Sequence, residues 1–237
     1  MILGLAACSG VGTRGPRLAQ GTFRTILIDP GHGGKDNGGT SGRRMPNALR
    51  EKDLTLDTAR RLQNRLRKAG FRVVMTRNDD RFIELDDRVA MANRQGAGTI
   101  LVSIHYNATA DPGANGAETY FWRADSHGLA TRIERALAAG TGERYGGVIR
   151  RRLRLTRNPE IPCVLCECAY LTHPEDNRRA AHPAFRERVA VAIADGIQEQ
   201  YRLGDAGIPS VPELHAPLCR ASDRYAAATS RRRHRWH

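Results

Sequence analysis

The 237-residue sequence lacks three features that would each define a class of protein. No apolar run is long enough to span a bilayer. The five cysteines are odd in number and lack framework spacing, so the chain is not a disulfide-stapled scaffold. Basic residues are not interleaved with aromatic ones, so nothing in the pattern favours nucleic acid as a partner. With 40% hydrophobic and 27% charged residues, the composition is typical of one globular domain.

Positive charge is present in excess. The sequence has 38 Lys and Arg against 25 Asp and Glu, a formal net charge of +13. Such an excess indicates affinity for anionic polymers or surfaces, including a cell wall or a membrane. Part of it is local, because the segment 220–237 contains six Arg and one Asp. We interpret 204–237, which begins with a Pro- and Gly-rich stretch, as a basic, disordered tail.

The N-terminal segment lacks a basic start, and MILGLAACSG is shorter than a complete secretory signal. However, Leu5-Ala6-Ala7-Cys8 resembles the bacterial lipoprotein cleavage box, in which the cysteine becomes lipidated. Residues 9–22 are rich in Gly, Ser, Thr and Arg, as in a tether. We predict an export or lipoprotein-like segment with its tether over 1–22 and a folded domain over 23–203. The alternative is an apolar N-terminus with no role in export.

Alternating strand and helix patterns fill the predicted domain. β-branched or aromatic runs bounded by Gly, Pro or Asn predict strands, and apolar residues at helical spacing predict helices. Several strands are almost continuously apolar, as expected when both faces are covered. The alternation predicts an α/β fold with a central, mostly parallel sheet. The expected strands are 25–29, 71–76, 99–104, 116–121 and 162–167, and the expected helices are 52–69, 84–95, 128–139 and 184–201.

Two histidines and two glutamates fall at the ends of these elements: His32 after the first strand, Glu51 at the first helix, His105 at the third strand and Glu167 at the last. In open α/β sheets functional side chains gather beyond the carboxyl ends of the strands. Two imidazoles and a carboxylate form a common open zinc site, and a further acid can act as general base. Singly, each residue has a structural explanation, such as a surface loop or a helix dipole. Glu167 is the hardest to explain in that way, because an acid inside an apolar run is costly unless paired.

Six motifs, spread over residues 24–202, carry a resemblance to a known family. They are IDPGHGGKDNGG, REKDLTLDTARRLQNRLRKAGFRVVMTR, LDDRVAMAN, ILVSIHYNA, GAETYF and CVLCECAYLTHPEDN. In these motifs the chain resembles the zinc-dependent N-acetylmuramoyl-L-alanine amidases of bacterial cell-wall remodelling, known as amidase type 3. The resemblance implies a single domain with a mixed, mostly parallel six-stranded sheet and helices on both faces, a phosphorylase/hydrolase-like fold. It also implies hydrolysis of the amide between N-acetylmuramic acid and L-alanine in peptidoglycan.

The same resemblance implies roles for individual residues. His32, Glu51 and His105 would bind one Zn²⁺ ion, and Glu167 would be the catalytic acid and base. Asp29 is a candidate orienting partner of His32, although an Asp at a strand end more often caps a turn.

Asn107 is a candidate substrate contact, with a loop hydrogen bond as an equal alternative. The expected partner is peptidoglycan, not nucleic acid. We expect a monomer exported to the periplasm or cell surface, with lipidated Cys8 as a potential membrane anchor.

Two departures from the family pattern carry predictions. Some members have a long insertion that folds into a helix and blocks the zinc ion. Here only 61 residues separate His105 from Glu167, so we expect an open site. The second departure is a cysteine cluster, Cys163, Cys166 and Cys168. A strand turns the last two away from Glu167, which favours buried apolar roles over a second metal site.

Two other functions remain open from the sequence. A zinc peptidase acting within the stem peptide would need the same metal ligands. A non-catalytic wall-binding module would explain the positive charge. A basic run is relevant to both the amidase and the binding module, because it could face the anionic stem peptide or wall polymer, although a solvated face is the default. The run consists of Arg150, Arg151, Arg152, Arg154 and Arg157.

Overall fold

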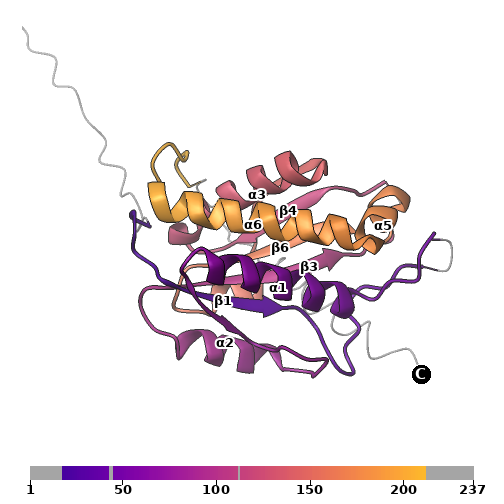
Figure 1. The fold of residues 1–237 in the computed structure, drawn as a ribbon, viewed down its shortest axis with the longest axis horizontal. Helices are drawn as coiled ribbons and strands as arrows, with labels where there is room; N and C mark the ends of the chain where they lie inside the picture. The colour runs from indigo at the N-terminus through magenta and orange to yellow at the C-terminus, as the bar shows by residue number, and fades with distance from the viewer. Residues whose placement is uncertain (1–17, 43–44, 112, 212–237) are drawn as a thin grey trace, which may run out of the picture.

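The structure is a computed structural model and describes residues 18–42, 45–111 and 113–211. Across these residues six strands form one sheet in the order β2-β1-β3-β6-β4-β5 (Figure 1). All neighbouring strands are parallel except β4 and β6, which run antiparallel. The predicted mixed, mostly parallel sheet is confirmed. The strands are β1 (Thr25–Pro30), β2 (Arg72–Met75), β3 (Thr99–Asn107), β4 (Ala117–Phe121), β5 (Tyr145–Arg150) and β6 (Cys163–Tyr170).

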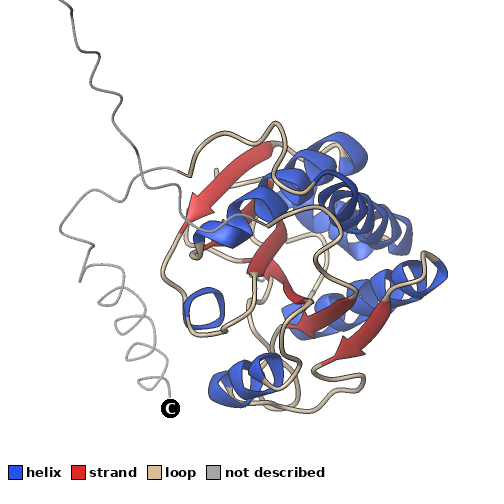
Figure 2. Cartoon of the chain, turned by 90° about the vertical axis from the view of Figure 1, so that its left-hand side faces the viewer, coloured by secondary structure: helices blue, strands red, loops and turns tan. Residues whose placement is uncertain are grey.

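Helices cover both faces of the sheet, as Figures 1 and 2 show from two directions. The larger apolar core lies between the sheet and three long helices, α1 (Glu51–Lys68), α3 (His127–Thr141) and α6 (Pro183–Leu203). A smaller apolar cluster lies on the other face, under α2 (Leu85–Asn93) and α4 (Arg154–Arg157). The remaining helical elements are η1 (Ala124–Ser126) and α5 (Pro174–Ala181).

Strand alternation explains the two cores. In β3, Ile100, Val102 and Ile104 belong to the larger core, whereas Leu101 belongs to the smaller one. All four are fully buried, and burying such a side chain contributes about 1.5–3 kcal/mol. Because both faces are apolar in this part of β3, the strand is sequestered between helix layers, as its sequence predicts.

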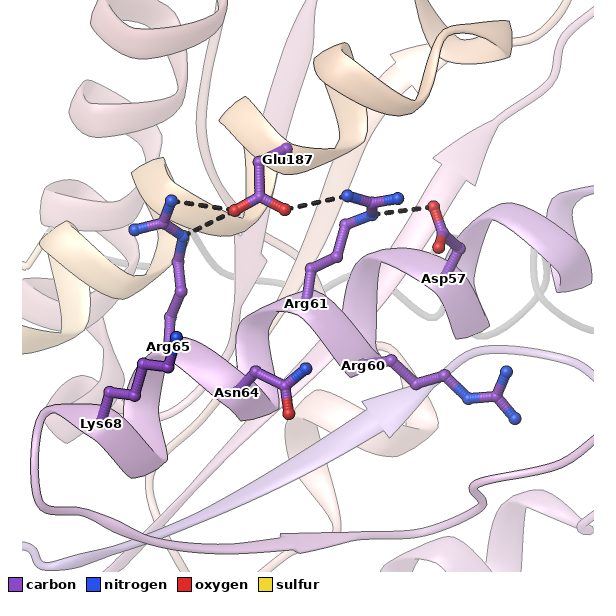
Figure 3. Close-up of a pocket in the computed structure, with 7 residues that line it drawn as sticks. All are labelled: Asp57, Arg60, Arg61, Asn64, Arg65, Lys68 and Glu187. Atoms are coloured by element: carbon purple, nitrogen blue, oxygen red, sulfur yellow. Dashed lines mark hydrogen bonds and ion pairs between the residues drawn. The ribbon is translucent and has the colours of Figure 1, made fainter.

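An ion-pair chain ties α1 to α6 on the outside of the larger core. Figure 3 shows it within a pocket of about 500 Å³, lined by residues of both helices. Arg61 lies between Asp57 at 3.0 Å and Glu187 at 2.9 Å, and Arg65 also binds Glu187 at 2.9 Å. These partly exposed pairs hold Arg61 and Arg65 against acids on the two helices.

The expected elements correspond closely to those observed. All five predicted strands and four predicted helices are present, whereas β5, α4 and α5 were not predicted from their residues. β3 and β6 extend to Asn107 and Tyr170, so His105 and Glu167 lie inside strands rather than at their ends.

The two ends of the described chain lie side by side. The Leu18 amide donates to Asp205, and the Gly21 amide donates to the carbonyl of Tyr201. The predicted division at 22/23 and 203/204 stays a prediction, and Cys8 lies outside the described residues. No helix within the described ranges combines the length and apolarity needed to cross a membrane.

Candidate metal centre

Three predicted ligands converge at the carboxyl edge of the sheet. His32 lies in the loop after β1, Glu51 is the first residue of α1, and His105 lies on β3. The Nε2 atom of His32 is 3.0 Å from one Glu51 oxygen, and the Nδ1 atom of His105 is 2.8 Å from the other. One ligand atom from each residue lies within 4.8 Å of the others, so a single cation can contact all three. Within the described residues this is the only such group found.

The Glu51 carboxylate is held in place by the backbone. Its Oε1 atom accepts a hydrogen bond from the Tyr106 amide at 3.1 Å, and its Oε2 atom accepts one from the Gly39 amide at 2.6 Å. Burial would raise the pKa of Glu51, but hydrogen bonds to His105 and His32 hold it well below its usual value. The carboxylate is therefore ionised, as a metal ligand must be.

Glycines leave the space in which the imidazoles pack. A Cβ atom on Gly31 would collide with the ring of His105, and one on Gly38 would lie 2.5 Å from both Glu51 Oε2 and His32 Cδ2. Among the non-glycine residues of the described chain, His32 alone has a positive φ, at +62°. That conformation is unfavourable for a residue with a side chain and persists only when its surroundings enforce it.

An acid and two buried arginines enforce it. The Asp36 carboxylate lies 2.7 Å from His32 Nδ1, which leaves Nε2 to face Glu51. Arg88 donates to the carbonyl oxygens of Pro30 and His32, at 2.8 and 2.7 Å. Arg77, fully buried, donates to the Pro30 carbonyl as well. These hydrogen bonds to the backbone carbonyl groups hold the glycine-rich loop in place.

Asp29 has no hydrogen bond with the His32 ring and acts on the loop through Arg88. Its carboxylate accepts hydrogen bonds from Thr76 at 2.6 Å, Ser103 at 2.8 Å and Arg88 at 2.6 Å. The orienting carboxylate on His32 is therefore Asp36, and Asp29 supports the loop by holding Arg88. Burial would raise the pKa of Asp29, but the charge of Arg88 and these hydrogen bonds lower it below its usual value.

Hydrogen bonding also determines the charge of His32. Burial acts to lower the pKa of the imidazole, but hydrogen bonds with Asp36 and Glu51 outweigh it and raise the pKa to about 9. Two carboxylates thus surround this ring and favour a positive charge there. Asp36 contacts Nδ1 of His32, and Glu51 lies beside Nε2. A carboxylate on the nitrogen that does not face the metal is the arrangement that orients histidine ligands in metalloproteins.

Glu167 lies beside this group. It pairs directly with His105 across β3 and β6, and with Glu118 across β6 and β4. The residue is half-buried, but its Oε2 atom is shielded from solvent and has no hydrogen-bond partner in the described structure. Burial, followed by the negative charge of Glu51, raises the pKa of Glu167 well above its usual value. This is the one predicted site residue whose polar atom remains unsatisfied.

Asn107, by contrast, makes local hydrogen bonds. Its side-chain oxygen accepts from the Ala108 amide at 2.9 Å, and its backbone carbonyl accepts from the Leu171 amide at 2.7 Å. These contacts agree with a loop hydrogen bond, the alternative to a substrate contact considered for Asn107.

The cysteine cluster is packed as predicted. Cys163, Cys166 and Cys168 are free, buried thiols. Cys166 and Cys168 contribute to the larger core, on the face of β6 opposite Glu167. Burial raises the pKa of Cys163 to about 12, so this thiol stays neutral.

Sequence reasoning missed the residues that support the ligands. Asp36, Arg77 and Arg88 were not singled out, although all three lie in motifs quoted above. A signal was available for the arginines, since Arg77 lies two residues after the end of β2 and Arg88 is a buried residue of a short helix.

The segment between His105 and Glu167 leaves one side of the metal group accessible. It contains β4, η1, α3, β5 and α4, and α3 packs against α6 in the larger core. A cavity of about 240 Å³ reaches His32 and His105 from the side of residues 82–85.

An α/β sheet with two imidazoles and a carboxylate beside a shielded acid at its carboxyl edge is typical of metal-dependent hydrolases. Within that class, the chain belongs to the N-acetylmuramoyl-L-alanine amidase family, whose profile matches residues 26–199.

Individual relatives agree with this family. The chain is 36% identical over 182 residues to the N-acetylmuramoyl-L-alanine amidase LytC of Bacillus subtilis, covering 75% of this chain and 36% of that protein. It is 33% identical over 178 residues to the probable cell wall amidase LytH of Staphylococcus epidermidis, covering 75% and 58%. The chain thus spans between about a third and three-fifths of these relatives.

Solved structures show the same fold. The N-acetylmuramoyl-L-alanine amidase from Clostridium difficile 630 superposes with a TM-score of 0.70 at 33% sequence identity. The match covers 76% of this chain and 97% of that one.

Proposed function

We propose that the protein is a zinc-dependent amidase that hydrolyses the bond between the lactyl group of N-acetylmuramic acid and L-alanine in peptidoglycan. Membership of the amidase family supports the reaction. The observation that carries the proposal is the convergence of His32, Glu51 and His105 within 4.8 Å beside the unsatisfied acid Glu167. A nitrogen and oxygen donor set with two histidines suits zinc among the common divalent ions.

His32, Glu51 and His105 would hold the ion, each through one ligand atom. When bound there, zinc supplies a Lewis acid for the amide carbonyl and lowers the pKa of a water molecule toward ~7. Asp36 and the backbone amides on Glu51 keep the ligands oriented, so little reorganisation is needed.

Glu167 would carry the proton. As a carboxylate it accepts a proton from the attacking water, whose oxygen bonds to the carbonyl carbon. It then delivers that proton to the alanine nitrogen as the carbon–nitrogen bond breaks, which releases a free amine and a carboxylic acid. Burial and the negative charge of Glu51 raise the pKa of Glu167 above its usual value, which favours its taking up a proton in this step.

The test measures zinc content and products together for the wild type and Glu167→Gln. We expect the wild type to release intact stem peptides with a free N-terminal alanine. The variant should retain zinc but lose cleavage by at least a hundredfold. New amines within the peptide would favour the peptidase alternative, and cleavage in a metal-stripped sample would contradict the mechanism.

We further propose that the protein works as an exported monomer, tethered to the membrane through Cys8. The lipobox-like Leu5-Ala6-Ala7-Cys8 supports the tether, and the relative named as a probable cell wall amidase supports export. Metabolic labelling with a fatty acid should mark the wild type but not Cys8→Ser. Unlabelled wild type in the soluble fraction would contradict the tether.

A further inference from the structure

Glu118 is an acid beside the candidate site that the proposed mechanism does not use. It lies on β4 directly opposite Glu167 on β6, and Glu167 in turn lies opposite His105 on β3. Register partners on neighbouring strands point to the same face of a sheet, so the three side chains form one row that begins at a candidate metal ligand. Glu118 is half-buried, so a molecule at the site can reach it.

A tyrosine hydroxyl fixes the position of the Glu118 carboxylate. Tyr120 is buried, and its hydroxyl donates to Glu118 Oε2 at 2.5 Å. Burial, and then the hydrogen bond to Glu118, raise the pKa of Tyr120 above its usual value, so the hydroxyl keeps its proton and remains a donor. On the neighbouring strand, Gly146 leaves room for the acid, because a Cβ atom there would lie 2.5 Å from Glu118 Cγ. The local structure therefore holds this carboxylate in a defined place.

No cation forms an ion pair with Glu118 or Glu167 within the residues that the structure describes. Arg151 lies over the Tyr120 ring, but the strand register places it level with Cys163, four positions before Glu167. Like charges directly opposite each other on neighbouring strands lower the stability of a sheet. A cationic group between the two carboxylates would remove that cost.

The proposed reaction generates such a group at this place. When the carbon–nitrogen bond breaks, Glu167 delivers its proton to the alanine nitrogen, which leaves as a neutral amine. A free α-amine has a pKa of about 7.7–8.0 and takes up one further proton near neutral pH. The new carboxylic acid, with a pKa of about 4, releases one, so the protons balance. The departing peptide is therefore cationic at the atom that Glu167 protonated.

The spacing of the two acids suits one ammonium group. Directly opposed side chains have Cβ atoms about 4.5–5.5 Å apart. A hydrogen bond from an ammonium group to a carboxylate spans about 2.7–2.9 Å, so one nitrogen can contact both carboxylates. On the other side of the metal group two acids are already engaged, because Asp29 pairs with Arg88 and Asp36 with His32.

We propose that Glu118 binds the α-ammonium group of the departing stem peptide, and that the peptide leaves across β4 and β5. This inference rests on the proposed amidase function. Glu118 holds the product and transfers no proton, which remains the role of Glu167. The register partner of Glu118 on β5 is Gly147, which has no side chain to cover the carboxylate from that strand.

The experiment compares two peptides that begin with L-alanine and differ only at the N-terminus, which is free in one and acetylated in the other. Calorimetry with the zinc-loaded protein at pH 7 measures both dissociation constants, and neither peptide contains the bond to be cleaved. The wild type should bind the free peptide about tenfold or more tightly than the acetylated one, since a hydrogen bond to a charged group contributes at least that factor.

Two variants of Glu118 test its part in this preference. In Glu118→Gln, which keeps the shape of the side chain and an acceptor for Tyr120, the two affinities should agree within about twofold. Glu118→Asp keeps the charge on a shorter side chain and should retain a preference of about threefold or more. A preference in Glu118→Gln as large as in the wild type would overturn the inference, because zinc or Glu167 would then account for recognition of the amine.

Glu84→Gln is the matched control, because Glu84 is an exposed acid that lines the cavity on the other side of the metal group. It should keep the wild-type preference, and loss of the preference there instead would place the peptide on the opposite side and overturn the inference. Equal affinities for the two peptides in the wild type would also overturn it, while leaving the amidase function intact. If the wild type released no free N-terminal alanine from peptidoglycan, the proposed function itself would fail.

Discussion

Removing Arg88 tests whether the buried ion pair beneath the glycine-rich loop maintains the metal centre. Arg88 and Asp29 are 3% and 0% exposed, and their closest atoms are 2.6 Å apart. Arg88→Met would leave the Asp29 carboxylate buried with only hydroxyl partners, Thr76 and Ser103. Breaking such a pair from one side costs about 3–5 kcal/mol. Since domains are typically stable by 5–15 kcal/mol, the variant should be weakened but still folded.

The loss of folding stability in Arg88→Met should depend on pH. In the wild type the pKa of Asp29 is below its usual value, so its contribution is present above about pH 4 and is lost as pH falls. Without Arg88, burial dominates and the folded-state pKa rises above the unfolded value. Folding of the variant would then weaken as pH rises, so the deficit should be larger at pH 7 than at pH 5. Each unit of pKa difference corresponds to about 1.36 kcal/mol.

Urea unfolding of the metal-free protein at pH 5 and pH 7 measures both effects. The double variant Asp29→Asn, Arg88→Met removes the unpaired charge and should recover about 2 kcal/mol or more of the loss at pH 7. Zinc affinity should fall about 10–100-fold in the single variant, because Arg88 holds the His32 carbonyl. A deficit that is the same at both pH values and in the double variant would refute the reasoning, because it would show that only the shape of Arg88 matters.

Three further outcomes are expected. Asp36→Asn should weaken zinc binding about 10–100-fold in a chelator competition, with little change in the unfolding midpoint of the metal-free protein. Gly38→Ala should lower stability by about 1–3 kcal/mol in urea, because its φ is +67° and the new Cβ atom would meet Glu51; Gly42→Ala, with open space around it, is the control. Glu134→Gln should stabilise the fold by up to about 3 kcal/mol at pH 8 and by little at pH 4.5. Burial raises the pKa of Glu134 to about 7 despite an opposing hydrogen bond, so the wild type loses stability between those values; equal denaturation midpoints at pH 8 would contradict this.

The strands that sequence reasoning found and the one it missed differ in how they are packed. β1, β3 and β6 are nearly continuous apolar runs, and their burial makes the pattern visible. β5 contains Gly146 and Gly147, which interrupt any alternation. The structure explains the first of them, because a Cβ atom on Gly146 would lie 2.5 Å from Glu118 Cγ. The close approach of β4 and β5 requires glycine at this position. Because glycine has a low strand propensity, the strand could not be recognised from its residues.

The grouping of His32, Glu51 and His105 could be predicted because each lies within two residues of the end of a strand or the start of a helix. The supporting residues could not be predicted in the same way. Arg88 contacts Asp29 and His32 across 59 and 56 positions, and Lys52 contacts Asp80 across 28. Such pairings depend on how the elements pack, which no local pattern encodes. Asp36 lies only four residues from His32, but the positive φ of His32 brings them together, and that conformation is not predicted for histidine.

One face of the sheet changes character along its strands, and this change places the site. Under α2 and α4, inward residues are apolar, such as Leu101 and Cys163. Along β3 the polar residues Ser103 and His105 follow on the same face, and along β6 the polar residue is Glu167, four positions after Cys163.

A polar residue next to an apolar core must find a partner or lower the stability of the fold. Asp29 on this face finds Arg88, Ser103 finds Asp29, and His105 finds Glu51. Glu167 alone in this row keeps a shielded oxygen with no partner in the described structure. A fold that satisfies each neighbour but leaves this acid unsatisfied retains it at a cost in stability. The proposed proton transfer beside His32, Glu51 and His105 would account for that cost, since an acid already committed to hydrogen bonds would serve it less well.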